Sequence, residues 1–466
     1  MIYDITVVGF GVGGLAAVLE IMKYSPKARV CIIGGGKEYK FENNFGVSIA
    51  KYYSSGGIVP IVGRPSISFG EPDVFGGGQI VNGGLFWNIP THKKEYLSLK
   101  FPNSAFADDR WDEVFRDMSD LMGVSIQPLG SAQQNIVSRK LLELGNIGAV
   151  RVPRAVADCQ FANRCGAGCP HEKKKTPLNY VKYLSEIGVD IFHGRVRNIV
   201  RDSNKISVKF NGRSIETQKL VLSAGVTQTP RLLKNSGLIS ERVWPLRLHL
   251  NLRFLAFFNE VINPWDATML AAQVQRGLPN GWVLMTKNFN DAEFLEYLNS
   301  LPAEINKNKL WDKRSNLALF TVMVDPSDSS FNFTSVLGQT VGAWSLGPKD
   351  FELIKSALSE SYEILKDIGA ISAIGNGLEH EGLVQINKII KLNFGVVPKS
   401  LKIMSVHGMS SVPMGSKYVR EEDGSLRDDT RIMIADASSI PCSLGESPQG
   451  TIMTLTSLNV RRWLNG

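Results

Sequence analysis

Glycine residues near the amino terminus have the spacing of a phosphate-binding turn. Gly9, Gly11 and Gly14 form a G-x-G-x-x-G motif, with Gly13 inside it, between a β-branched run and a helix-like segment. Such glycines permit a tight turn, close approach of a pyrophosphate to the backbone, and close packing of the helix whose N-terminus attracts the anion. The motif therefore predicts that the chain binds a dinucleotide.

The residues after the second strand bear on which dinucleotide binds. The strand Val30–Ile33 runs into Gly34–Gly36, where an Asp or Glu would ordinarily accept a hydrogen bond from the adenine ribose. Glu38 or backbone groups, Gly34 among them, are candidates to hold the ribose instead. Because no carboxylate here would repel a 2′-phosphate, and Lys37 is near, NADP remains open at this point.

Sulfur and imidazole groups cluster near the middle of the first half. Cys159, Cys165, Cys169 and His171 could together bind a metal, but their spacings of six, four and two residues are irregular for structural zinc or iron–sulfur sites. No metal is therefore predicted. The basic run Lys173–Lys175 that follows is expected to be a solvated loop or the start of a helix.

Apolar runs and their spacing place the glycine turn on a β-α-β unit. Ile5–Val8 reads as a strand, Leu15–Lys23 as a helix and Val30–Ile33 as a second strand. A similar pattern of strands and helices returns later in the chain, whereas the region between shows amphipathic strands and one long helix. The later elements are a helix at Leu178–Ile187, strands at Val189–Phe192, Ile206–Phe210, Leu220–Ser223, Leu317–Val324 and Arg431–Asp436, and helices at Asp350–Ile368 and Thr451–Trp463.

These elements predict an α/β fold of two domains. A discontinuous Rossmann-type nucleotide-binding domain is expected to comprise residues 1–100, 155–246 and 402–466. An α+β substrate domain built on an antiparallel sheet is expected to comprise residues 101–154 and 247–401. The second region shows no pattern that names the substrate.

Bulk composition excludes several classes of protein. The 466 residues, 43% of them apolar, can form two substantial cores. The formal net charge of +8 is spread along the chain without a zinc-finger or RNA-binding signature, so no nucleic-acid partner is expected. No segment offers about 18 uninterrupted apolar residues, so no membrane span is expected. The start lacks a basic leader with a cleavage site, and five cysteines suit a reducing compartment, so the predicted location is the cytoplasm.

Five further segments resemble, in the same order, the signatures of the glucose-methanol-choline (GMC) flavoprotein family. They are residues 76–84, 223–233, 407–415, 436–441 and 448–453. The resemblance extends from the first strand to the last helix and implies that the dinucleotide is FAD. The segment Cys165–Pro170, together with Leu248-His249, resembles the branch that contains long-chain alcohol oxidases and proteins similar to cholesterol oxidase and gluconate dehydrogenase.

The resemblance also implies which residues contact FAD. The first signature would lie along the flavin, the segment Asp436–Pro441 would contact the pyrophosphate and ribityl chain, and the last would start a helix beneath the ring. A backbone group at Val196 would meet the adenine. Besides those of the opening turn, the expected contacts are Gly77, Gly78, Asn82, Gly83, Gly84, Val196, Ala224, Gly225, Asp436, Ala437, Pro448, Gln449 and Thr451.

Within the resemblance, His407 takes the place of the family's catalytic histidine. A histidine can remove the hydroxyl proton while a hydride passes to flavin N5. The five other histidines, His249 included, lie in no such motif. Where the family places a second His or Asn to hold the substrate oxygen, this chain has Ser447, which cannot act as a base near neutral pH. The substitution leaves open an altered substrate geometry, a slow enzyme or participation of Glu446.

The sequence therefore predicts an FAD-dependent oxidoreductase that acts on the CH–OH group of a small-molecule alcohol. The alcohol could be sugar-like, sterol-like or lipid-like, and the electron acceptor could be oxygen, a quinone or a protein. A second hypothesis is a flavin-binding biosynthetic protein without net alcohol oxidation, either isomerase-like or dependent on a partner. A third is an NADP-dependent reductase.

Overall fold

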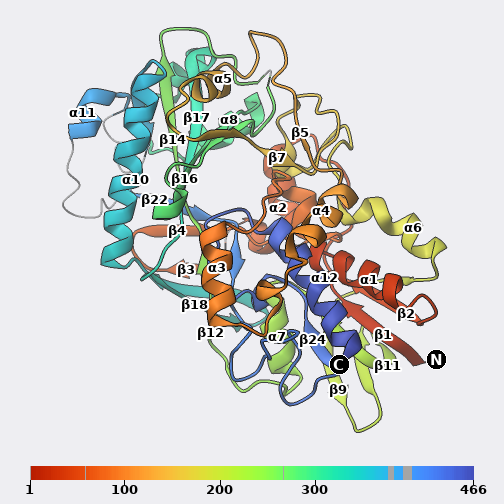
Figure 1. Ribbon diagram of the computed structural model, residues 1–466. Helices are drawn as coiled ribbons and strands as arrows, with labels where there is room; N and C mark the ends of the chain where they lie inside the picture. The colour runs from red at the N-terminus through yellow and green to blue at the C-terminus, as the bar shows by residue number, and fades with distance from the viewer. Residues whose placement is uncertain (1, 58, 266, 376–381, 392–400) are drawn as a thin grey trace.

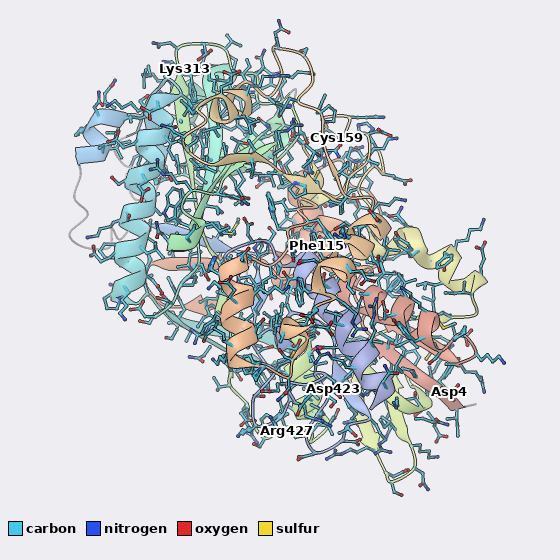
Figure 2. All side chains as sticks on the ribbon, in the orientation of Figure 1. Asp4, Phe115, Cys159, Lys313, Asp423 and Arg427 are labelled. Carbon is cyan, nitrogen blue, oxygen red and sulfur yellow. The ribbon has the colours of Figure 1, made fainter. Side chains whose placement is uncertain are left out.

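Two large β-sheets form the framework of the molecule in the computed structural model (Figure 1). The structure describes residues 2–57, 59–265, 267–375, 382–391 and 401–466. Side chains fill the space around both sheets (Figure 2). None of the helices in these ranges combines the length and the apolar content that crossing a membrane requires.

The first sheet is the nucleotide-binding sheet expected from the glycine turn. Its strand order is β8-β2-β1-β11-β10-β9, and β24 pairs with the carboxyl half of β11. Pairing is parallel among β8, β2, β1, β11 and β24, and antiparallel from β11 through β10 to β9. The strands are β1 Ile2–Val8, β2 Val30–Gly34, β8 Asp190–His193, β9 Val196–Arg201, β10 Ile206–Phe210, β11 Arg213–Leu222 and β24 Ile432–Ile434.

Helices cover this sheet and carry the last segment of the chain back to the first. The helix α12 (Gln449–Asn465) packs against α1 (Val12–Tyr24) and α4 (Trp111–Leu121), as Figure 1 shows. Arg461 of α12 forms a buried ion pair with Glu20 of α1, with Nε 2.6 Å from Oε1. The strand β2 is buried throughout, as expected for a parallel strand with both faces covered.

The second sheet has the order β21-β20-β14-β17-β16-β15-β6, and every pairing along it is antiparallel. The strand β22 joins it through β14 and pairs in parallel with β4. These strands are β4 Ser66–Phe69, β6 Ala149–Arg151, β14 Leu250–Phe258, β15 Ala272–Val274, β16 Trp282–Lys287, β17 Leu317–Val324, β20 Ala370–Gly375, β21 Val384–Gln385 and β22 Lys402–Ser405.

One face of the second sheet is covered by α10 (Pro348–Asp367), which contacts β16, β17 and β20 and also packs against α11 (Ile386–Lys391). The apolar residues of α10 recur at helical spacing and are buried there, among them Ile354, Leu358 and Leu365. In Figure 1, α10 and α11 lie on the side of the molecule away from α1. The opposite face of the sheet is therefore left to other parts of the chain.

Smaller elements complete the structure. A four-stranded sheet has the order β12-β18-β19-β3, and β13 pairs with β23 and β5 with β7. The strands are β3 Ile61–Val62, β5 Ser125–Ile126, β7 Pro153–Arg154, β12 Trp244–Pro245, β13 Arg247–Leu248, β18 Ser330–Val336, β19 Gln339–Ser345 and β23 Gly408–Met409. The remaining helices are α2 Phe45–Tyr52, α3 Thr91–Lys100, α5 Ile136–Glu143, α6 Val181–Glu186, α7 Gln228–Asn235, α8 Asp291–Ser300 and α9 Lys307–Asp312.

The fold class predicted from the sequence, a Rossmann-type domain with an α+β part on an antiparallel sheet, is confirmed. The domain boundaries stay a prediction, and two segments assigned to the nucleotide-binding domain pair elsewhere. Ser66–Phe69 and Lys402–Ser405 belong to the second sheet, because β22 pairs with β14 as well as with β4. The helix expected at Leu178–Ile187 is divided into a 3₁₀ turn at Pro177–Tyr180 and α6.

Candidate functional site

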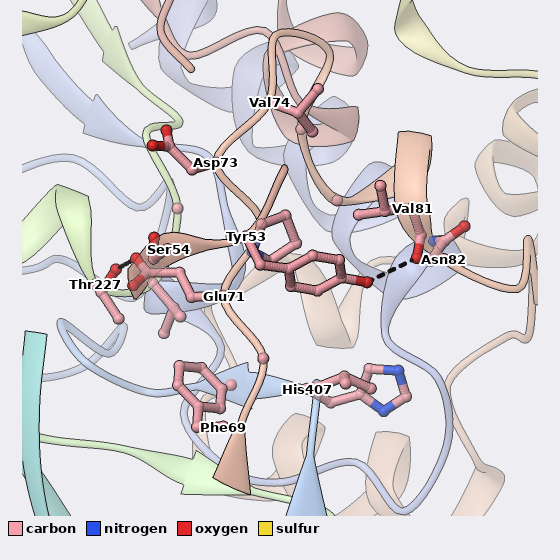
Figure 3. Close-up of a pocket in the computed structure, with 18 of the residues that line it drawn as sticks. Tyr53, Ser54, Phe69, Glu71, Asp73, Val74, Val81, Asn82, Thr227 and His407 are labelled. Atoms are coloured by element: carbon pink, nitrogen blue, oxygen red, sulfur yellow. Dashed lines mark hydrogen bonds between the residues drawn. The ribbon is translucent and has the colours of Figure 1, made fainter. Parts of the chain in front are cut away.

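A cavity of about 1400 Å³ extends from the glycine turn after β1 to the second sheet. Enclosed sites for small ligands usually measure about 300–1,000 Å³, so this one has room for a dinucleotide and a substrate together. In Figure 3 the ring of Tyr53 crosses the cavity toward the loop with Val81 and Asn82, and its hydroxyl donates to the Val81 carbonyl oxygen at 3.1 Å. His407 also lines this cavity.

The glycine turn is built so that only one of its positions faces open space. A Cβ at Gly9, whose φ is +112°, would lie 1.9 Å from the Ser223 carbonyl oxygen, and one at Gly13 would lie 2.0 Å from that of Ala435. A Cβ at Gly11 would meet only the Gly77 Cα, at 4.0 Å. The N-terminus of α1 therefore opens into the cavity at Gly11, where an anion can approach the backbone amides.

Two buried cations hold the glycine-rich loop that faces this turn. Lys174 Nζ donates to the carbonyl oxygens of Ile80, Asn82 and Cys165 at 2.9, 2.7 and 2.9 Å. Arg154 Nε donates to the Gly83 carbonyl oxygen at 2.9 Å. Burial lowers the pKa of Lys174 to about 8. The expectation that Lys173–Lys175 is a solvated run is thus wrong for Lys174, because three carbonyl groups replace its water.

An amide pair joins this loop to the start of α12. Asn82 Nδ2 donates to Gln449 Oε1 at 3.0 Å, and Asn82 Oδ1 accepts from the Gly84 amide at 2.9 Å. Gln449 lines the cavity, and its buried Nε2 has no hydrogen-bond partner within the described part of the chain. A buried donor without a partner costs free energy. A carbonyl group of a bound ligand would satisfy it.

A carboxylate after β24 fixes a second set of loops at the cavity wall. Asp436 Oδ2 accepts from the Gly225 amide at 2.8 Å and from Thr229 Oγ1 at 2.6 Å, and its Oδ1 accepts from the Ser438 amide at 2.9 Å. Asp436 therefore orients the segments that begin at Ala224 and Ala437.

Most of the residues expected to contact the cofactor line the cavity, although their individual roles stay predictions. Gly34 does not, because a Cβ there would lie 2.3 Å from the Phe75 ring, and Glu38 is exposed outside the cavity. The lining positions are Gly9, Gly11, Gly13, Gly77, Gly78, Asn82, Gly83, Val196, Ala224, Gly225, His407, Asp436, Ala437, Ser447, Pro448 and Gln449; those outside are Gly14, Gly34, Glu38, Gly84 and Thr451.

The strand β2 is not followed by the Asp or Glu that usually binds the adenine ribose, but the carboxylate of Asp73 lies near the end of this strand. Asp73 lines the cavity, its carbonyl oxygen accepts from the Lys37 amide at 3.1 Å, and its side chain pairs with Arg195. Sequence reasoning missed Asp73 because it reaches the end of β2 through the bridge between Lys37 and Val74. Asp73 could accept a hydrogen bond from a ribose hydroxyl there.

Two of the three cysteines considered as metal ligands contact polar groups of the protein. The Cys165 thiol lies 3.0 Å from Arg154 Nη2, and the Cys159 thiol, labelled in Figure 2, lies 3.4 Å from Thr268 Oγ1. His171 is exposed. Arg154 and Cys165 thus belong to the packing behind the glycine-rich loop.

Two histidines meet at the other end of the cavity. The antiparallel pairing of Leu248 with Gly408, between β13 and β23, brings the neighbouring residues His249 and His407 together. Their Nδ1 atoms lie 3.0 Å apart, and the rings are nearly perpendicular, at 88°. His249, which no sequence motif singled out, is fully buried, whereas His407 is partly exposed to the cavity.

The hydrogen bonds of this pair determine where its protons lie. The Gly445 amide donates to His249 Nε2 at 2.9 Å, so this nitrogen carries no hydrogen. A neutral His249 then donates from Nδ1 to Nδ1 of His407, which leaves the His407 proton on Nε2. Burial lowers the pKa of both rings to about 3. Lys93 lowers the pKa of His249 further, and His249 lowers that of His407 further. Both imidazoles are therefore neutral near pH 7.

Ser447 and Glu446 lie at the turn before α12. Ser447 lines the cavity, whereas Glu446 is buried beside it and accepts from the side-chain amides of Gln273 and Gln275. Its second oxygen, Oε2, has no partner among the described residues. Burial raises the pKa of Glu446 to about 7. Only Ser447 of the two is placed to touch a ligand directly.

The glycine turn and His407 thus line one cavity at the edge of a Rossmann-type sheet. Residues 49–252 match the family model described as GMC oxidoreductase. An uncharacterized GMC-type oxidoreductase of Sinorhizobium fredii is 22% identical over 97% of this chain and 92% of its own length. A long-chain-alcohol oxidase of Arabidopsis thaliana, FAO4A, is 22% identical over 97% of this chain and 67% of its own length.

Solved structures share the fold at low identity. Pyridoxine 4-oxidase from Mesorbium loti has a TM-score of 0.72 and 14% identity, covering 100% of this chain and 99% of its own. A formate oxidase of Aspergillus oryzae has a TM-score of 0.73 and 12% identity, and the match covers 99% of this chain and 98% of the formate oxidase chain. Residues 49–252 thus form a GMC oxidoreductase domain, whose family consists of FAD-dependent oxidoreductases, and the resemblance drawn from the motifs is confirmed.

The residues present fit FAD, the cofactor of this family. Open space at Gly11 suits its pyrophosphate, and the unpartnered Gln449 donor suits a carbonyl group of its ring system. When bound, FAD supplies an acceptor for a hydride equivalent from a substrate carbon. The prediction that the cofactor is FAD is therefore confirmed.

Proposed function

We propose that this chain oxidises a CH–OH group of a small-molecule alcohol, with His407 contacting the hydroxyl oxygen and acting as the base. The observation that carries this proposal is the His249–His407 pair, which leaves Nε2 of His407 as the ring nitrogen free for a ligand in the cavity. Ser447, across the same cavity, supplies a hydroxyl that can hold the substrate oxygen.

The histidine pair has two neutral arrangements with different uses. In the first, His407 donates from Nε2 to the hydroxyl oxygen and orients the substrate. In the second, His407 donates from Nδ1 to His249, its Nε2 is free to accept the hydroxyl proton, and the Gly445 amide loses its acceptor. One buried hydrogen bond is worth about 1–3 kcal/mol, so the second arrangement is accessible at a moderate cost.

His249 further supports the protonated product of this step. Once His407 has accepted a proton at Nε2, its Nδ1–H donates to His249 Nδ1, and hydrogen bonds to a charged group are stronger than neutral ones. His249 is therefore a positioning residue for the base. Removal of the proton from the hydroxyl oxygen and loss of a hydride from the carbon that bears this oxygen leave a carbonyl product.

Anaerobic mixing tests the proposal. The purified yellow protein is mixed with a panel of alcohols and the flavin band near about 450 nm is followed, with dithionite as the positive control. We expect at least one alcohol to bleach the band in the wild type and none to do so in His407→Phe at equal flavin content. If dithionite bleaches the band and no alcohol does, the protein belongs to the second hypothesis, a flavin-binding role without alcohol oxidation.

A further inference from the structure

The second sheet presents polar and charged side chains to the substrate end of the cavity. Asn251 and Arg253 of β14, Thr321 of β17 and Lys287 of β16 line it, and Glu293 of α8 lines it from outside the sheet. Arg253 is directly paired with Thr321 across the two strands. An apolar substrate such as a long-chain alcohol would have to desolvate all of these groups, so this wall disfavours one.

Several of these groups lack partners in the protein. Nε of Arg253, Nδ2 of Asn251 and both carboxylate oxygens of Glu293 are buried and make no hydrogen bond to any described residue. The Glu293 side chain is nearly inaccessible, with 6% of its surface exposed, although it lines the cavity. Native proteins leave few buried polar atoms unsatisfied. A cluster of them around one cavity indicates a polar ligand.

The charges of the cluster do not balance. Arg253 and Lys287 carry two positive charges, and Glu293 carries one negative charge, which leaves one positive charge uncompensated. Burial lowers the pKa of Arg253 and lowers that of Lys287 to about 8, while it raises the pKa of Glu293. These directions mean that enclosure opposes the charged forms, and that a bound monoanion would stabilise the two cations.

The strand that carries Arg253 also leads to the catalytic pair. Asn251 and Arg253 of β14 share a face of this strand, and His249 directly precedes the strand. At about 3.3 Å per residue, His249 and Arg253 are roughly 13 Å apart along the strand. His407 and Arg253 both line the same cavity.

We propose that the substrate is a hydroxy acid, whose hydroxyl lies at His407 and whose carboxylate is bound by Arg253 and Lys287. The inference rests on the proposed alcohol oxidation and adds the class of alcohol. The planar guanidinium of Arg253 matches a carboxylate with two parallel donors. Asn251 Nδ2 supplies a further donor, and Glu293 compensates one of the two positive charges.

A substrate series tests the proposal with the FAD-loaded enzyme. ω-Hydroxycarboxylates of three to eight carbons are compared with the diols and the hydroxy methyl esters of equal length, and the second-order rate of flavin reduction is measured. We expect one acid to exceed its diol and ester by roughly tenfold or more, as the loss of a charge-assisted hydrogen bond implies. Equal rates for acid, diol and ester would overturn the inference.

Variants assign the preference to named residues. Arg253→Met and Lys287→Met should each lower the rate with the acid by roughly 10–100-fold, a much larger factor than for the diol. Arg253→Lys, which keeps the charge, should recover part of the loss. Arg276→Met makes the same chemical change in an exposed ion pair with Glu360 and should have no effect. An equal loss with acid and diol would mean that these residues serve structure alone.

A binding measurement separates this inference from the proposed oxidation. Glutarate, which has no hydroxyl group, is titrated into the FAD-loaded wild type and Arg253→Met, and the heat of binding is measured. Binding to the wild type alone, together with no bleaching by any alcohol, would support the anion site and refute alcohol oxidation. Bleaching by neutral alcohols, together with no glutarate binding, would refute the anion site and leave alcohol oxidation standing.

Discussion

Replacement of His249 by phenylalanine removes both nitrogens of the buried ring and keeps nearly the same volume. Gly445 then loses its acceptor at 2.9 Å, and His407 loses its partner at 3.0 Å. His249 does not line the cavity, so its effect on the reaction passes through its two partners, His407 and the Gly445 amide that precedes Ser447. We expect His249→Phe to bind FAD normally and to react slowly.

The size of the effect follows from the lost hydrogen bonds. A hydrogen bond to a charged group contributes about 1.5–3 kcal/mol, and the one from protonated His407 to His249 exists only after the base has accepted its proton. At about 1.4 kcal/mol per factor of ten, the rate of flavin reduction should fall roughly 10–150-fold. The unpaired Gly445 amide should lower the free energy of unfolding by about 1–3 kcal/mol.

Anaerobic stopped-flow measurement of the flavin band, with the fastest substrate of the ω-hydroxycarboxylate series, gives the rate directly. His171→Phe serves as the control, because His171 is exposed outside the cavity lining. A rate in His249→Phe equal to that of the wild type, at equal flavin content, would refute the reasoning that His249 acts through His407.

Three further predictions concern the framework of the site. Lys174→Met should lower the free energy of unfolding by about 2–4 kcal/mol and release FAD on mild heating, whereas the exposed neighbour Lys175→Met should not; thermal unfolding with flavin fluorescence compares them. Gly11→Ala should fold normally but bind FAD weakly in a titration, because its Cβ enters the open space of the cavity. Gly13→Ala should instead unfold at a lower temperature, since its Cβ lies 2.0 Å from a carbonyl oxygen. Equal FAD affinity of Gly11→Ala and the wild type would contradict the phosphate-site assignment. In the folded protein Glu446 keeps its proton up to about pH 7, whereas in the unfolded chain it loses the proton near the ordinary pKa of a glutamate. The free energy of unfolding should therefore fall by about 3 kcal/mol as the pH rises from the ordinary pKa to about 7. Denaturant unfolding of Glu446→Gln should show a weaker dependence of this free energy on pH.

The nucleotide-binding half of the site could be predicted because its chemistry is local in sequence. Gly9, Gly11 and Gly13 perform their tasks within one turn, and the strand and helix beside them follow from apolar spacing. Gly34 and Glu38 were misplaced for the opposite reason. Whether a residue after β2 faces the cavity depends on the segment through Asp73, which packs there from a different part of the chain.

The substrate half depends on pairing between distant segments. His249 gains its role from the pairing of Leu248 with Gly408. The residues beside His249 in the sequence do not predict this pairing. One local signal was present: polar residues at 251 and 253 alternate with apolar residues at the start of β14, which is unusual for a buried strand. That pattern, applied to Asn251 and Arg253, would have marked this strand as the wall of a polar site.

The most direct test of the account concerns the bond that breaks at the carbon bearing the hydroxyl group. Flavin reduction in the wild type is measured with one substrate carrying hydrogen and then deuterium at that carbon. We expect the deuterated substrate to reduce the flavin several-fold more slowly, and deuterium oxide as solvent to have its own effect through His407. Equal rates with both substrates, or a rate that is the same in His407→Phe, would contradict the central claim.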